Sequence, residues 1–233
     1  MNPKDLLFVG VLLFVTLNLS AQTLSPRFGI KAGLSLSYAT VNDARGTDSK
    51  TGFHIGGTFE YPLSPRFLIQ SGLLFSTKGS QVHVLNGSHY IPSPPDDTHT
   101  FNESYLMLPL YGAYKLNLTS DFNITFGIGP YLGYGIGGKT KQKLNSGSWS
   151  DGITEIQWDT FGNGIYDESR DWLRGTTLKR TDIGLGANID FEYRRFILSV
   201  GYEKGLRNIA AQENTHGLSY RNNTGQASIG YKL

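Results

Sequence analysis

Residues 122–138, FNITFGIGPYLGYGIGG, alternate strictly between two kinds of side chain. The even positions from Phe122 to Ile136 are apolar or proline, while most odd positions are glycine or small and polar. Alternate side chains of a β-strand point to opposite faces, so the pattern predicts a strand whose two faces meet different surroundings. Neither a helix nor an ordinary buried strand needs this arrangement.

The same two-faced pattern recurs along the chain and predicts eight strands. In the third of them Leu68 and Leu74 interrupt the polar face, so the pattern leaves its orientation open. The predicted strands occupy residues 28–38, 53–61, 67–75, 106–116, 122–136, 182–192, 196–203 and 227–233.

The connections between these strands favour a membrane barrel over a soluble sandwich or barrel with an apolar core. Long connections (41–52, 79–103, 139–180 and 207–221) alternate with short ones (62–65, 117–121 and 193–195). This places every large loop at one end, and aromatic residues of the apolar face gather at the other end, as at a membrane interface. We therefore expect an all-β fold, an eight-stranded antiparallel up-and-down transmembrane β-barrel with short periplasmic turns and long extracellular loops.

The N-terminal residues 1–21 have the features of a secretory signal peptide. Lys4 precedes an apolar core from Leu6 to Leu19, and the small residues Ser20 and Ala21 follow it. We expect cleavage after Ala21, which leaves residues 22–233 as one barrel domain.

The composition excludes several classes of function. The formal net charge is +2 without a basic run, which argues against nucleic-acid binding. The chain has no cysteine, so disulfides, thiolate metal sites and a cysteine nucleophile are excluded.

Six segments in order along the chain resemble the PorT-like outer-membrane β-barrel proteins typical of Bacteroidetes. The segments are FGIKAGLSLS at 28–37, LIQSGLLFSTKG at 68–79, SYLMLPLYGAYKL at 104–116, GIGPYLGYGIGG at 127–138, KRTDIGLGANIDFEY at 179–193 and GYEKGLRNI at 201–209. The resemblance implies an outer-membrane barrel, and some members of that family serve the type IX secretion system. The closing GQASIGYKL resembles the C-terminal signal read by the barrel-assembly machinery.

Charged residues on the polar face are the first candidates for function. Lys31, Glu60, Lys115, Asp190 and Glu192 all fall near the turn end, and their mixed signs predict a charge network that fills the lumen. A proton or ion path is the alternative interpretation. An eight-stranded barrel is just wide enough for its own side chains, so a diffusion pore is not expected.

Two other groups of residues are candidate sites. His54 near the loop end, with Asp182 and Glu203 at similar height, suggests a small outer-membrane enzyme if the side chains converge. Asp159, Asn163 and Asp167 partly match a calcium loop, whereas Phe161 and Arg170 replace expected ligands, so a plain acidic turn is the other interpretation. The remaining histidines (His83, His89, His99 and His216) fall in predicted loops without metal-ligand spacing.

These observations predict a monomeric, non-enzymatic barrel without a cofactor that acts as a scaffold or binding protein. The expected contacts are outer-membrane lipid, the barrel-assembly machinery during biogenesis, and a surface protein or glycan met through the loops at 79–103 and 139–180. A soluble ligand-binding barrel remains the alternative outside the membrane.

Overall fold

The computed structural model describes residues 25–42, 46–85, 96–143, 155–162, 177–211 and 219–233. These residues form ten strands, all paired in antiparallel fashion. The strands are β1 (Arg27–Val41), β2 (Gly46–Pro62), β3 (Phe67–Leu85), β4 (Asp96–Asn117), β5 (Phe122–Gly137), β6 (Lys139–Lys143), β7 (Glu155–Asp159), β8 (Thr181–Tyr193), β9 (Phe196–Gly205) and β10 (Tyr220–Lys232). No helix among the described residues is long and apolar enough to cross a membrane.

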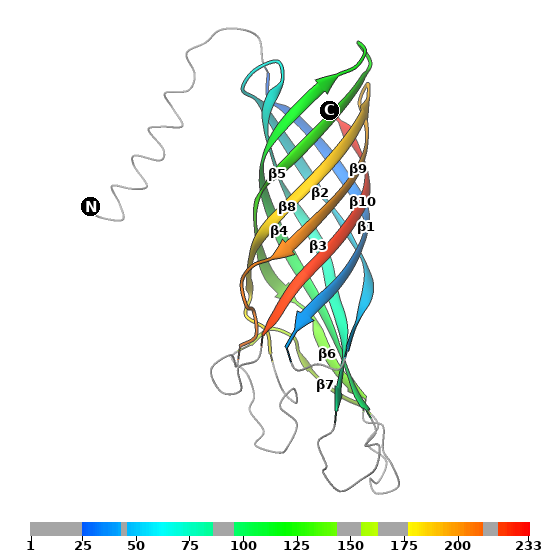
Figure 1. Cartoon of the computed structure of the whole chain (residues 1–233), viewed down its shortest axis with the longest axis vertical. Coiled ribbons are helices and arrows are strands. Elements are labelled where there is room, and N and C mark those ends of the chain that lie inside the picture. The colour runs from blue at the N-terminus through cyan, green and yellow to red at the C-terminus, as the bar shows by residue number, and fades with distance from the viewer. Residues whose placement is uncertain (1–24, 43–45, 86–95, 144–154, 163–176, 212–218) are drawn as a thin grey trace, which may run out of the picture.

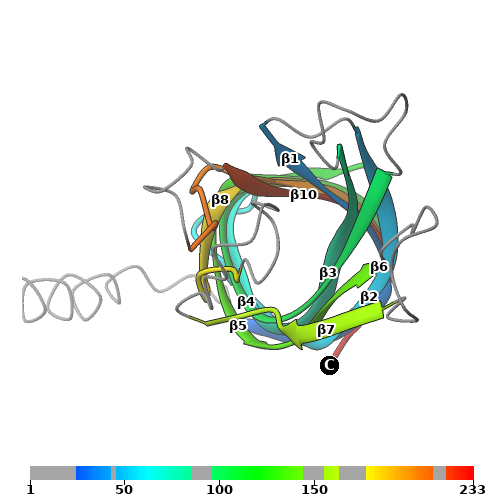
Figure 2. The same ribbon diagram turned by 90° about the horizontal axis from the view of Figure 1, so that it is seen from below.

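Eight of the strands close into an up-and-down barrel (Figures 1 and 2). The ring runs β3-β2-β1-β10-β9-β8-β5-β4, and the pairing of β3 with β4 completes it. The predicted fold class is thereby confirmed. Closure gives every wall strand two hydrogen-bonded neighbours, which is the condition for a sheet to lie within hydrocarbon.

The outer face of the wall is an apolar belt. Phe126, Leu185 and Val200 are 45%, 49% and 43% exposed, so the apolar parity points outward as predicted. Aromatic rings pair around the turn end, where Phe28 lies 5.2 Å from Phe59 and Phe196 lies 5.2 Å from Tyr231 between ring centroids. Other outward residues of the belt include Ile30, Leu34, Leu36, Phe53, Ile55, Leu73, Leu106, Leu108, Leu110, Ile128, Leu132, Ile183, Leu198 and Ile229.

The inward glycines leave room for large side chains of neighbouring strands. A Cβ added at Gly184 would lie 2.6 Å from the ring of Tyr131, and one at Gly186 would lie 2.1 Å from the hydroxyl of Tyr111. Both rings are buried inside the barrel, with Tyr105 and Met107. The inward glycines of β8 therefore leave space in the lumen that the rings of Tyr131 and Tyr111 fill.

The sequence does not decide which face of β3 points outward, but the burial of its side chains does. Leu68 and Leu74 are each 6% exposed and point inward, while Phe67 and Leu73 are more than half exposed on the belt.

The wall strands continue beyond the belt, and this corrects the predicted loop bounds. β2 begins at Gly46, β3 ends at Leu85 and β4 begins at Asp96, so much of the predicted loops 41–52 and 79–103 is strand. Within 139–180, β6 pairs with β4, and β7 pairs with β6. We call residues 77–85 of β3, 96–104 of β4, β6 and β7 together the blade.

The sequence predicts loops where the blade lies because the outward face of the blade is polar. Its outward residues, which include Gln81, Thr98, Thr100 and Asn102, are only half-buried, whereas Val82 and Phe101 between them are buried. His83 and His99, predicted to lie in loops, belong to β3 and β4. The other two histidines of that set, His89 and His216, lie outside the described residues.

The opposite end of the barrel carries three tight turns, which span residues 63–66, 118–121 and 194–195. Arg194 has a left-handed φ of 55°, and its backbone N–H donates to the carbonyl oxygen of Asp121 at 2.8 Å. The short connections of the prediction are confirmed at this end.

Candidate functional site

The lumen contains two clusters of charged side chains, one near each end. The turn-end cluster consists of Glu60, Gln70, Lys115, Asp190, Glu192 and Lys232. Lys232 Nζ donates to Glu60 Oε2 at 2.7 Å and to Glu192 Oε2 at 2.9 Å, and Lys115 Nζ donates to Glu192 Oε2 at 3.0 Å. The two lysines lie on β10 and β4 and the two carboxylates on β2 and β8, so these ion pairs connect four strands of the wall.

The turn-end cluster brings together most of the predicted lumen charges. Asp190 joins it through Gln70, whose Nε2 donates to Asp190 Oδ2 at 2.8 Å and to Glu60 Oε1 at 3.3 Å. Among the residues that the structure describes, no carboxylate pairs with Lys31; its amine donates to Ser199 Oγ at 3.4 Å.

Two members of the turn-end cluster, Gln70 and Lys232, were missed from the sequence. Tyr231 points outward, and successive residues of a strand face opposite sides, so the sequence alone could have placed Lys232 inside the barrel. Gln70 lies in the strand whose orientation the sequence left open.

The loop-end cluster consists of Lys78, Glu103, Asp182, Glu203 and Asn222. Lys78 Nζ donates to Glu203 Oε2 at 2.8 Å and lies 3.9 Å from Asp182 Oδ2. Asn222 Nδ2 donates to Glu103 Oε2 at 2.7 Å. All five residues are at most 5% exposed, so water screens these interactions weakly.

Aromatic hydroxyls and rings surround the loop-end cluster. The Lys78 amine lies 4.9 Å from the centroid of the Tyr131 ring and 5.7 Å from that of Tyr105. Tyr131 donates its hydroxyl to Asp182 at 3.4 Å, and Tyr220 donates to Glu103 Oε1 at 2.8 Å. Lys78 thus lies among two carboxylates and two aromatic faces, the usual surroundings of a bound ammonium.

His54 does not form a pair with a carboxylate of the described residues. It is 1% exposed, and neither ring nitrogen has a hydrogen-bond partner within the described part of the chain. Asp182 and Glu203 are instead engaged by Lys78. The convergence that the enzyme hypothesis required is therefore not found at His54.

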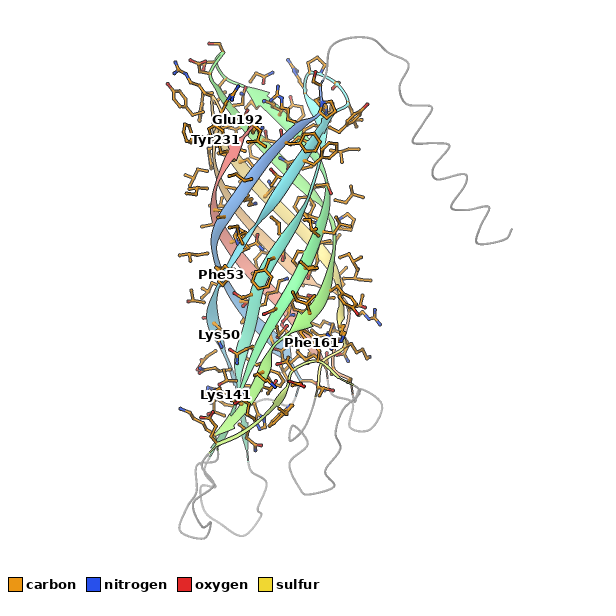
Figure 3. The ribbon with its side chains drawn as sticks, turned by 180° about the vertical axis from the view of Figure 1, so that it is seen from behind. Lys50, Phe53, Lys141, Phe161, Glu192 and Tyr231 are labelled. Carbon is orange, nitrogen blue, oxygen red and sulfur yellow. The ribbon has the colours of Figure 1, made fainter. Side chains whose placement is uncertain are left out.

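An apolar cap lies over the loop-end cluster. It consists of Phe101, Phe161, Leu178, Ile209, Ala210 and Tyr220, each at most 5% exposed. Leu178 bridges to Phe161 and to Ala210, and its N–H donates to the carbonyl oxygen of Thr160 at 2.7 Å. Figure 3 shows Phe161 at the same end of the barrel as Lys50 and Lys141, opposite Glu192 and Tyr231.

A cavity of about 70 Å³ borders the turn-end cluster. Lys31, Gln70, Tyr111, Asn188 and Ser199 are among its lining residues. The space has room for a few water molecules. It is too small for a metabolite.

The calcium-loop candidate is only partly described. Asp159 lies in β7 and accepts from Lys139 Nζ at 2.5 Å; this hydrogen bond lowers the pKa of Asp159. Asn163 and Asp167 lie outside the described residues. Within the described ranges, no group of three His, Cys, Asp or Glu residues could hold a metal ion.

The comparison with family models gives the class of fold. A family model described as outer membrane protein beta-barrel domain matches residues 20–211. A search of curated proteins finds no match.

Three solved structures illustrate the likeness. They are Ail of Yersinia pestis (11% identity, 90% of this chain and 99% of that chain, TM-score 0.40), Neisserial surface protein A (13%, 88% and 97%, 0.44) and OprG of Pseudomonas aeruginosa (14%, 90% and 96%, 0.45). At such low identities and TM-scores the likeness carries nothing about a shared task.

Proposed function

We propose that this chain, which belongs to the outer membrane protein beta-barrel domain family, is a non-enzymatic binding protein or scaffold of the outer membrane. Its working surface is the loop end, and its partner is a surface protein or glycan. Family membership and the apolar belt support the outer-membrane location. The soluble ligand-binding barrel has no such support, because its apolar side chains would face water.

The blade is the observation that carries this proposal. β3 and β4 extend past the apolar belt, and β6 and β7 lie beyond it. The outward face of these four strands presents amide, hydroxyl and lysine side chains. Lys139 and Lys141 form ion pairs with Asp159 and Glu155, which hold β7 beside β6. An ordered polar sheet that the wall does not need for closure is a suitable platform for protein or glycan contacts.

The lumen supports the scaffold part of the proposal. The turn-end cluster, the loop-end cluster and the cap fill successive levels of the barrel, so we propose that the chain conducts neither ions nor metabolites. We further propose a cleaved signal peptide at 1–21, insertion by the barrel-assembly machinery as a monomer, and a link to secretion in line with the PorT-like resemblance.

Site-specific photocrosslinking in intact cells tests the proposed working surface. A photoreactive residue placed at Gln81 or Thr100 on the blade is expected to yield an adduct of discrete mass that a protease or a glycosidase removes. The same residue at Leu108 on the belt is the control and should label lipid without such a band. A discrete adduct at Leu108, with none at the blade, would locate the partner on the wall and overturn the proposal.

A further inference from the structure

The loop-end cluster contains more acid than base. Glu103, Asp182 and Glu203 are 1%, 0% and 5% exposed, and Lys78 is the only lysine that they contact among the described residues. With all groups ionised, three buried carboxylates would share one lysine in direct contact. Burial of an unpaired charge is so unfavourable that the group takes up a proton instead.

The partners of the three carboxyls differ. Lys78 forms ion pairs with Glu203 at 2.8 Å and with Asp182 at 3.9 Å. Glu103 is held by neutral groups, namely the hydroxyl of Tyr220 and the amide of Asn222. The charge of Glu103 is therefore the one that the cluster compensates least.

The hydrogen bonds around Glu103 accommodate a proton. Tyr220 also bonds Ser80 at 3.0 Å, and either hydroxyl of that pair is able to donate. A protonated Glu103 would donate to Tyr220, which would then donate to Ser80. Asn222, whose Nδ2 bonds Glu103, has a buried Oδ1 without a hydrogen-bond donor. The cluster is therefore short of hydrogen-bond donors, and an added proton would supply one.

We propose that Glu103 binds a proton at neutral pH and that the loop end of the lumen is a proton-binding site. The proton reduces the charge below the apolar cap. Tyr220 connects the site to the cap, because its ring lies 5.0 Å from that of Phe101 and its carbonyl oxygen accepts from the N–H of Ile209 at 2.9 Å. Loss of the proton would therefore weaken the seating of the cap.

The location of Glu103 is consistent with this assignment. Leu106 is the last outward apolar residue of β4 toward the loop end, so Glu103 lies beyond the membrane-spanning part of the wall. Its complete burial raises the pKa of its carboxyl. The titratable groups that face it are Lys50 of β2, Lys78 of β3, Tyr105 of β4, Asp182 of β8 and Tyr220 of β10, with Glu203 of β9 beyond Lys78.

The proton gives the folded state a definite pH dependence. The folded chain binds one proton more than the unfolded chain between the ordinary pKa of glutamate and the raised pKa of Glu103. Stability is then full below the ordinary value and falls as pH rises toward the raised one. The barrel should therefore be more stable at pH 5 than at pH 9.

Infrared difference spectroscopy of the full chain in detergent tests the proposal directly. The wild-type spectrum at pH 7 should contain the carbonyl stretch of a buried protonated carboxyl, shifted by exchange into D₂O. Glu103→Gln, a neutral mimic of the protonated group, should lose this band and abolish the excess of melting temperature at pH 5 over pH 9. Glu155→Gln, which changes an exposed carboxyl on β7, is the matched control and should leave both unchanged.

Each alternative outcome contradicts a stated part of the proposal. A wild-type spectrum without the band means that Glu103 is ionised. A band that survives in Glu103→Gln and is lost in Asp182→Asn assigns the proton to Asp182 instead. If Glu103→Gln does not fold, a pH titration of the carbonyl band of the wild-type protein tests the proposal. Absence of that band at pH 5 would overturn the proton-binding site.

Discussion

Lys78 and Glu203 form an ion pair across the lumen, with the lysine amine 2.8 Å from the carboxylate although 125 residues separate them. β3 and β9 stand four places apart in the ring of eight wall strands. The pair thus joins opposite sides of the barrel. It stabilises the closed cross-section in a way that pairing between neighbouring strands does not.

Removal of the Lys78 charge is predicted to destabilise the barrel strongly. Lys78→Met keeps the length of the side chain and leaves Glu203 and Asp182 buried without a cation. Loss of one partner of a buried pair costs about 3–5 kcal/mol. Urea unfolding of detergent-solubilised protein, followed by the electrophoretic shift between folded and unfolded barrel, measures the loss.

The double variant Lys78→Met with Glu203→Gln distinguishes a charge effect from a packing effect. It removes both charges of the closest pair and should recover more than half of the lost stability. If the double variant is no more stable than the single one, the stabilisation by Lys78 comes from its packing against Tyr131 and Tyr105.

The wall of the barrel could be predicted from the sequence because it depends on a local period. Leu185 and Val200 face outward since every second residue of a strand shares a face, and this holds whatever the neighbouring strand is. Closure followed from the alternation of long and short connections. The same rule failed for the outward face of the blade, where Thr98, Thr100 and Asn102 are polar because no hydrocarbon covers them.

The contacts inside the lumen could be predicted only in part. Parity and height placed Asp182 and Glu203 inside, near the loop end. Which side chains meet across the lumen depends on the shear and tilt of the whole ring, which no local pattern encodes. For this reason the sequence suggests His54 as the partner of Asp182, whereas in the structure Lys78 occupies that position.

Gly184 is predicted to reject even a methyl group. A Cβ there would lie 2.2 Å from the carbonyl oxygen of Lys204 and 2.6 Å from the ring of Tyr131. The backbone of β9 cannot move away without loss of its pairing with β8, so Gly184→Ala should cost about 1–3 kcal/mol. Gly112→Ala is the control, because the nearest atom to its Cβ would be 4.0 Å away. Equal unfolding midpoints for the two variants would contradict the close packing of the lumen.

Lys232 is predicted to contribute far more to stability than Lys31, although both point into the turn-end half of the lumen. Lys232 bonds two carboxylates, and Lys232→Met leaves Glu60 buried without its lysine while Glu192 keeps Lys115, so the change should cost about 3 kcal/mol or more. Lys31 bonds a serine hydroxyl at 3.4 Å, and Lys31→Met should cost about 1 kcal/mol or less. Urea midpoints of the two variants under one detergent condition give the comparison. The reverse order would show that Lys31 is the cation that neutralises the lumen.

The absence of cysteine makes the orientation of the barrel directly measurable, because any introduced thiol is the only one in the chain. Gln157 is exposed on β7 of the blade, and Ser120 is exposed in a tight turn at the other end. If the blade faces outward, a membrane-impermeant maleimide should label Gln157→Cys on intact cells and Ser120→Cys only after the outer membrane has been permeabilised. Ser199→Cys, buried in the lumen at 2% exposure, should resist the reagent until the barrel is unfolded. Labelling of Ser120→Cys on intact cells, with protection of Gln157→Cys, would reverse the barrel in the membrane. The blade could not then be the surface that meets an extracellular partner.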